Sequence, residues 1–325
     1  MTAPVRVAVV GGGTSCEHEV SLASAAAIAT ALTSAGYVVV PLTIDRDGVW
    51  RDREQRPVGL AGAVHVLTSC AVVVPALHGP HGEDGTLAAL CDLAGVPWVG
   101  SPLGAGALAM DKWATKLVAE AVGVATAPGC LLTAEATYDF EGPVVVKPVA
   151  AGSSHGVTLV RTPAALGPAL RAALALDDRV LVEEVVAGRE IDLAVLGRPD
   201  GSRTVAPALE VLRPEAGIFD LATKYDGSAR FLVPAPLSGA DRRHLERAAV
   251  TIYDALGCAG IARIDFFLTA DGPVLNEVNT MPGFTEYSQV PRMFAAGGIG
   301  YADLLDLVVG DALAGDPRGK VFACT

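Results

Sequence analysis

The sequence has no excess of basic residues, and this limits the partners that it suits. Its 325 residues include 24 Lys and Arg against 36 Asp and Glu, a formal net charge of −12 at pH 7. Nucleic-acid binding depends on neutralising phosphates with Lys and Arg, so we expect no nucleic-acid partner.

Long hydrophobic runs and targeting patterns are also missing. No apolar stretch approaches the roughly 18 residues needed to cross a bilayer, so no membrane partner is expected. The opening residues, MTAPVRVAVVGGG, lack the charged start and long apolar stretch of a secretory signal peptide. We therefore expect a cytoplasmic protein.

Paired cysteines are absent too. No C-x-x-C pair occurs, which argues against structural zinc, and the scattered spacing is poor for a disulfide framework. We expect reduced, mostly buried thiols at Cys16, Cys70, Cys91, Cys130, Cys258 and Cys324.

What the sequence does contain is an enzyme-like composition, 51% hydrophobic and 18% charged, with length for two or three compact units. In the first hundred residues helical stretches alternate with apolar runs, a pattern that predicts a parallel, Rossmann-like sheet and an α/β fold. The runs that we expect to form its strands are 5–10, 37–44, 71–77 and 96–100.

Further strands are predicted at 181–186, 190–197 and 202–212, and a C-terminal helix at 301–314. Apolar periodicity weakens from 213 to 228, where we expect a mobile surface loop.

A glycine-rich turn, VVGGGTSCEHEVS, follows the first strand, at a place where backbone N–H groups can meet an anion. It is not G-x-G-x-x-G, so a dinucleotide site is weakly supported, and a tight strand-to-helix junction is the ordinary alternative. Glu17 is either an acid favoured by the helix dipole or a ligand for a substrate ammonium.

A second turn, VVVKPVAAGSSHG, places Lys147 on a strand just before a loop with two hydroxyls. A lysine beside a Gly/Ser loop suits a di- or triphosphate, although exposed strand lysines and Gly-Ser turns are common. The stretch ALHGPHGEDG gathers His78, His81, Glu83 and Asp84, but its spacing matches no zinc pattern.

Acid and amide side chains interrupt the strand-like run RIDFFLTADGPVLNEVNTMPGF, residues 263–284. The ADG turn predicts a hairpin, and alternation puts Glu277 and Asn279 on one face, where Asp265 could meet them from the partner strand. Three oxygen ligands would suit Mg²⁺. The alternative is the solvated face of an edge hairpin.

Taken in order, these motifs resemble D-alanine–D-alanine ligase, an ATP-grasp enzyme. The resemblance runs from about residue 5 to 307 through GGGTSCEHEVS, ALHGPHGEDGT, MDK, VVKP with GSSHG, EEVVAGRE, KYDGS and ARIDFFL with NEVNTMPGFTEYS. It implies an ATP-grasp fold with an N-terminal Rossmann-like substrate domain (1–102), a small central domain (103–185) and a C-terminal catalytic domain (186–325).

The resemblance also implies ATP, two Mg²⁺ (or Mn²⁺) ions and D-alanine as ligands, and a homodimer. The metal ligands would be Asp265, Glu277 and Asn279. The residues that it assigns to ATP are Lys112, Lys147, Ser153, Ser154, Glu183, Glu184, Val186 and Glu190. The sequence departs from the family at Val185, where an aromatic residue is common, and at His155.

For the chemistry, the resemblance implies phosphorylation of one D-alanine carboxylate and attack on it by the amine of a second. Arg263 and the Gly283 N–H would stabilise the oxyanion. Glu17 and His78 would bind the first substrate, and Lys224 and Ser288 the second. Tyr225, hydrogen-bonded with Ser153 and Glu17, would latch segment 213–228 as a lid.

Three alternatives stay open at this point. The second substrate could be D-lactate or D-serine. The identity of residue 289, Gln beside Ser288, does not indicate whether D-serine is accepted. An NAD-dependent oxidoreductase would need G-x-G-x-x-G with an acid about 20 residues later, and GGGTS stands there instead. An inactive ATP-grasp binding module would be favoured by missing metal ligands, but all three are present.

Tyr225 provides a first test. Tyr225→Phe removes only the phenolic O–H, so the expected result is a partial loss of dipeptide synthesis and a gain of D-alanyl-D-lactate near neutral pH. Product masses with D-lactate supplied check this. An unchanged product ratio, or a wild type that already prefers D-lactate, would remove this role.

Overall fold

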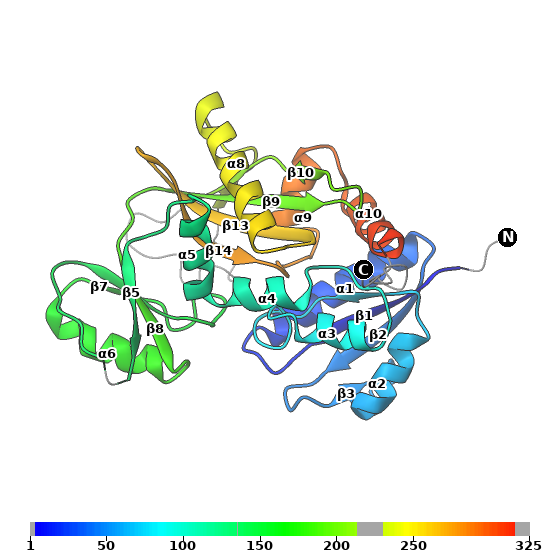
Figure 1. Ribbon diagram of the computed structural model, residues 1–325. Helices are drawn as coiled ribbons and strands as arrows, with labels where there is room; N and C mark the ends of the chain where they lie inside the picture. The colour runs from blue at the N-terminus through cyan, green and yellow to red at the C-terminus, as the bar shows by residue number, and fades with distance from the viewer. Residues whose placement is uncertain (1–3, 135, 213–229, 316–325) are drawn as a thin grey trace, which may run out of the picture.

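The computed structural model describes residues 4–134, 136–212 and 230–315. Within these residues the strands form three sheets, which Figure 1 shows as three regions of the molecule. The predicted loop at 213–228, with Lys224 and Tyr225, lies outside the described residues.

The first sheet is built around β1 (Arg6–Gly12), which pairs in parallel with β2 (Val38–Ile44) and β4 (Val72–Pro75). The short β3 (Trp50–Arg51) runs antiparallel to β2 at the edge. The parallel sheet expected from the strand-helix alternation is therefore confirmed. The helices of this region are α1 (His18–Ser34), α2 (Gly59–Thr68) and α3 (Thr86–Leu93).

The strand predicted at 96–100 does not form. Only an isolated parallel bridge joins Trp98 to Val73, whose N–H donates to Pro97 O at 2.8 Å. A proline has no N–H to extend a ladder, so Pro97 keeps the pairing to this bridge.

The second sheet is antiparallel and holds β5 (Gly129–Thr133), β8 (Arg179–Glu184), β6 (Val144–Pro148) and β7 (Thr158–Val160), in that order. Helix α6 (Pro163–Leu174) packs on it. Two helices, α4 (Leu103–Met110) and α5 (Lys112–Ala121), precede the sheet in the chain.

The third sheet has the order β12, β11, β9, β13, β14, and β10 also pairs with β9. The run predicted as one strand at 202–212 is split into β10 and β11, because Pro207 between them lacks an N–H. The strands are β9 (Arg189–Gly197), β10 (Arg203–Val205), β11 (Leu209–Leu212), β12 (Arg230–Leu232), β13 (Gly260–Thr269) and β14 (Gly272–Asn279).

The two faces of this sheet have different roles. Alternate residues of β9, such as Leu193, join a core with α8 (Gly239–Ala255), which crosses one face in Figure 1. The opposite face packs apolar residues near its edge against α9 (Gln289–Ala296) and α10 (Tyr301–Ala314). The remainder of that second face carries the polar residues described below.

Helix α10 also reaches the first sheet. Its Leu305 and Val309 are buried in one cluster with Val7 of β1 and Val72 of β4. The C-terminal helix, which is confirmed at 301–314, thus contacts elements far away in the sequence.

A matched pair of leucines tests the core beneath the hairpin. Leu245 of α8 is fully buried, whereas Leu93 of α3 is 88% exposed. Leu245→Ala should lower the free energy of unfolding by about 2–5 kcal/mol, and Leu93→Ala should change it by less than about 0.5 kcal/mol. Chemical denaturation measures both, and equal losses would contradict this packing.

Candidate functional site

The polar face of the third sheet is set by the register of the predicted hairpin, which the structure confirms. Asp265 of β13 pairs with Glu277 of β14, and Arg263 pairs with Asn279, so all four side chains share one face. A bulge follows Asp265, and Asn279 Nδ2 donates to Asp265 Oδ2 at 3.1 Å. The candidate metal ligands are therefore brought together.

Arg263 forms a bidentate pair with Asp265, referred to below as the fork. Its Nε and Nη2 donate to the two carboxylate oxygens, each at 2.8 Å. Burial lowers the pKa of the Arg263 guanidinium, but Asp265, Asp192 and Glu277 together outweigh burial and raise it. The guanidinium is therefore a fixed positive charge beside the acids.

Behind this fork lie two residues that the sequence analysis did not assign to the site. Gln289, at the start of α9, accepts from Arg263 Nη1 at 2.7 Å and donates to Asp192 Oδ2 at 2.8 Å. Asp192 of β9 is 1% exposed and stands beside Asp265 in the ladder. The signal for Asp192 was an acid two residues after Glu190, followed by the apolar run LAVL, within the strand EIDLAVLG.

Lys112 connects this face to the Gly/Ser loop. It is the first residue of α5, and its Nζ donates to Ala151 O at 2.8 Å. The same Nζ lies 3.6 Å from Glu277 Oε2. Lys112 thus joins the loop to the hairpin.

Lys147 of β6 is paired with Glu183 of β8 at 2.6 Å rather than exposed. Lys116, which the sequence analysis missed, contacts the other oxygen of Glu183 at 2.9 Å. Burial raises the pKa of Glu183, but the two lysines outweigh burial and lower it. A signal for Lys116 was its spacing, one helical turn after Lys112 in α5.

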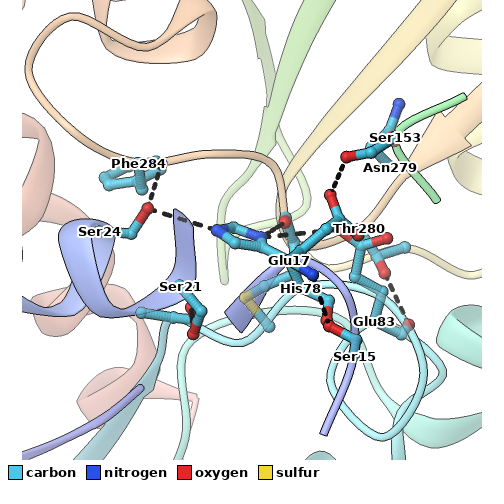
Figure 2. A network of polar contacts seen from close by, with 12 residues as sticks. Ser15, Glu17, Ser21, Ser24, His78, Glu83, Ser153, Asn279, Thr280 and Phe284 are labelled. Carbon is cyan, nitrogen blue, oxygen red and sulfur yellow. Dashed lines mark hydrogen bonds and ion pairs between the residues drawn. The ribbon is translucent and has the colours of Figure 1, made fainter. Parts of the chain in front are cut away.

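Glu17 lies at the start of α1 and accepts a hydrogen bond from Ser153 Oγ. Ser153 and Ser154 have φ of 50° and 57°, a left-handed conformation that is strained for residues other than glycine. A Cβ on Gly152 would come within 2.5 Å of Glu17 Oε2, so glycine is what permits this approach. The loop and α1 therefore meet at the site (Figure 2).

His78 is 4% exposed and lies between distant segments. Its Nδ1 contacts Met281 O at 2.9 Å, and its Nε2 lies 3.3 Å from Ser24 Oγ (Figure 2). Burial lowers the pKa of His78, but Glu83, Glu17 and the Met281 carbonyl outweigh burial and raise it. Burial also raises the pKa of Glu83, although His78 opposes this shift.

The turn after β14 contains Gly283 and Ser288. Ser288 Oγ accepts from Thr285 N at 3.0 Å and lies 2.8 Å from Thr285 Oγ1. A Cβ on Gly283 would lie 3.4 Å from Ser288 Oγ, an ordinary contact. The fold itself therefore does not require glycine at 283.

The remaining predicted residues line the connection from β8 to β9. Glu184 ends β8 and is exposed, Val186 lies two residues further on, and Glu190 lies near the start of β9. Val185, at the position where the family commonly has an aromatic residue, is 45% exposed.

Helix length does not indicate a membrane span. In the described part of the chain no single helix is long and apolar enough to cross a membrane, and α9 with α10 reaches that length only as a pair bent by 101°.

Solved structures share this architecture. The D-Ala:D-Ser ligase VanG from Enterococcus faecalis superposes with a TM-score of 0.81 at 33% identity, covering 95% of this chain and 100% of that one. The Bacillus anthracis D-alanine–D-alanine ligase complexed with ATP gives 0.81 at 27% identity, covering 97% and 100%. The fold is the ATP-grasp fold of these ligases.

Sequence comparisons identify the family within this fold. Models described as D-ala D-ala ligase N-terminus and C-terminus match residues 6–101 and 126–310. The D-alanine–D-alanine ligase of Nocardia farcinica is 42% identical, covering 97% of this chain and 98% of that one. That of Corynebacterium aurimucosum is 40% identical, covering 96% and 98%. The chain belongs to the D-alanine–D-alanine ligase family, as the resemblance predicted.

The His78 environment makes a measurable prediction. Its pKa is raised above 6.5 in the folded protein, so unfolding near neutral pH releases a proton, and stability from His78 is lost as pH rises through its folded pKa. The NMR titration midpoint of His78 should lie above 6.5 and fall in Glu83→Gln, which removes the nearest carboxylate. A midpoint below 6.5 in both proteins would mean that burial dominates.

Proposed function

We propose that this chain joins two D-alanines into D-alanyl-D-alanine with conversion of ATP to ADP and phosphate, for peptidoglycan precursor synthesis. The relatives of about 40% identity align with this chain over nearly their full length. They are D-alanine–D-alanine ligases, which supports the proposed reaction. The observation that carries the assignment to this face is the row Asp265–Glu277 with Arg263 at one side and Lys112 at the other.

The proposed reaction has two steps. An oxygen of the first D-alanine carboxylate attacks the γ-phosphorus of ATP, and the bond to the ADP oxygen breaks, leaving an acyl phosphate. The amine of the second D-alanine then attacks the carbonyl carbon, loses a proton, and phosphate departs with the electrons of the C–O bond. Both steps build negative charge that fixed cations and N–H groups can stabilise.

The donor set at the hairpin fits Mg²⁺. Asp265, Glu277 and Asn279 offer hard oxygen ligands. Oδ1 of Asp265 keeps a lone pair beyond its bond to Arg263, whereas Oδ2 also accepts from Asn279 Nδ2. We propose these three residues as ligands of two Mg²⁺ (or Mn²⁺) ions, which when bound would neutralise charge on the transferred phosphoryl group.

The phosphates of ATP would meet Lys112, Lys147 and the loop with Ser153 and Ser154. Glu183 keeps Lys147 in a defined position before the nucleotide binds, through their 2.6 Å ion pair. We assign adenine and ribose to the connection of Glu184, Val186 and Glu190. With Val185 aliphatic, adenine would lack aromatic stacking there.

We assign each of the two substrates to a different group of residues. Glu17 suits the ammonium of the first D-alanine, and His78 fixes the loops around it. Ser288 suits the carboxylate of the second. The fold leaves room for a side chain at Gly283, so close approach of the substrate is the reason we propose for glycine there.

The domain division, the oligomeric state and the lid are also proposed. The three-domain division at 102 and 185 and a homodimer follow from the resemblance. Lys224 and Tyr225, which lie outside the described residues, retain their proposed roles at the second substrate and in a lid.

Synthesis of D-alanyl-D-serine is a second candidate, because VanG, 33% identical, is a D-Ala:D-Ser ligase. Recognition of a D-serine hydroxyl requires a polar group near the second substrate that can form a hydrogen bond with it. The Gln289 amide beside Ser288 has its oxygen engaged by Arg263 and its nitrogen by Asp192.

One assay separates these functions. ADP release is measured with D-alanine alone, with added D-lactate and with added D-serine, and the products are identified by mass. D-Alanyl-D-alanine should dominate in all three mixtures. A predominance of D-alanyl-D-serine would move the second candidate ahead.

The hairpin assignment is tested with two acid-to-amide changes. Glu277→Gln should lower kcat roughly 100-fold or more, since a lost metal carboxylate costs several kcal/mol of transition-state stabilisation. Asp271→Asn, at the exposed turn of the same hairpin, is the matched control and should leave kcat unchanged. Near-normal activity of Glu277→Gln at ordinary Mg²⁺ would remove the metal assignment.

A further inference from the structure

A chain of buried polar groups runs behind Arg263. Asp192 Oδ2 accepts from Gln289 Nε2 at 2.8 Å, and Gln289 Oε1 accepts from Arg263 Nη1 at 2.7 Å. Arg263 in turn donates Nε and Nη2 to Asp265, each at 2.8 Å. The chain joins β9, α9 and β13, three separate elements.

Asp192 determines which way the Gln289 amide faces. A carboxylate only accepts, so it requires the amide NH₂ on its side and leaves the amide oxygen toward Arg263. The reversed amide would put its oxygen against the carboxylate and its NH₂ against the guanidinium. Asp192 therefore acts on Arg263 through Gln289.

Gln289 supplies a second anchor for the guanidinium. The fork with Asp265 comes from the same strand, two residues away, and holds the edge made by Nε and Nη2. The bond from Nη1 to Gln289 comes from α9. Together these bonds use three of the five N–H groups of arginine and orient the others.

The burial of Asp192 argues that this arrangement has a purpose beyond packing. Asp192 is 1% exposed on a strand whose neighbouring residues form apolar cores. A buried carboxylate costs free energy that an apolar residue of similar size would avoid. The hydrogen-bonded link from Asp192 to Arg263 runs through Gln289, because Asp265 occupies the fork and Asp192 itself lies 4.0 Å from Arg263 Nε.

We propose that Asp192 and Gln289 are positioning residues, which fix the plane of the Arg263 guanidinium so that its remaining N–H groups face the negative charge of the transition state. The catalytic part of this proposal rests on the proposed function. A group that acts only on orientation in the transition state should affect kcat more than KM.

The variants separate orientation from charge. Asp192→Leu removes both the charge and the acceptor at similar size, whereas Asp192→Asn removes the charge and keeps an acceptor for Gln289. Gln289→Met keeps the side-chain length and removes both hydrogen bonds. Asp271→Asn, at the hairpin turn, serves as the control for a lost surface charge.

The first measurement is independent of turnover. In protein labelled with ¹⁵N-arginine, NMR reports the rotation of the Arg263 guanidinium, assigned by its loss in Arg263→Lys. Rotation about Cζ–Nη1 should be slow in wild type and Asp192→Asn, and fast in Gln289→Met and Asp192→Leu. Equal rotation in wild type and Gln289→Met would overturn the positioning.

The second measurement is steady-state ligase kinetics. Asp192→Leu and Gln289→Met should each lower kcat about 30- to 100-fold with KM changed less than about threefold, the scale of a misplaced transition-state donor. The double variant should be no worse than the singles, because both act on one group. Asp192→Asn should recover kcat to within about fivefold of wild type.

The outcomes remain distinguishable. If the guanidinium is released but kcat is unchanged, the catalytic part is wrong. If Asp192→Asn is as impaired as Asp192→Leu, Asp192 acts through its charge, and orientation is wrong. If wild type joins no D-amino acids, the proposed function fails, while the NMR measurement still decides whether Asp192 and Gln289 hold Arg263.

Discussion

The buried guanidinium of Arg263 is the charge on which the functional face depends. Asp192, Asp265 and Glu277 are register partners across three adjacent strands, and carboxylates so placed repel one another. Arg263 beside them offsets that repulsion, and Lys112 at 3.6 Å offsets it at Glu277. The acids can therefore stand together on a sheet without destabilising it.

The same principle operates in the second sheet. Glu183 lies between Lys147 and Lys116, and its carboxylate pairs with both buried ammonium groups and holds them in place. Buried cations held in advance cost little reorganisation when an anionic ligand arrives. The geometry of both sheets is thus prepared by ion pairs within the protein.

The structural features that depend on neighbouring residues could be predicted from the sequence. The ADG turn and the alternation of Arg263, Asp265, Glu277 and Asn279 are enough to place four side chains on one hairpin face. The failures at 96–100 and 202–212 arose from prolines, whose missing N–H groups outweighed apolar runs. Asp192 and Gln289 could not be paired from sequence, because 97 residues separate them and only the packing of α9 on the sheet brings them together.

The Gly/Ser loop shows how the three regions act together. Its Ala151 carbonyl accepts from Lys112, and its Ser153 donates to Glu17 of the first region. Lys112 also faces Glu277, so one short loop lies between the residue proposed for the first ammonium and a proposed metal ligand. A phosphate bound by Lys112 would compete with both Ala151 and Glu277 for the same ammonium. If Lys112 binds phosphate as proposed, nucleotide binding would weaken its bond to the loop that contacts Glu17.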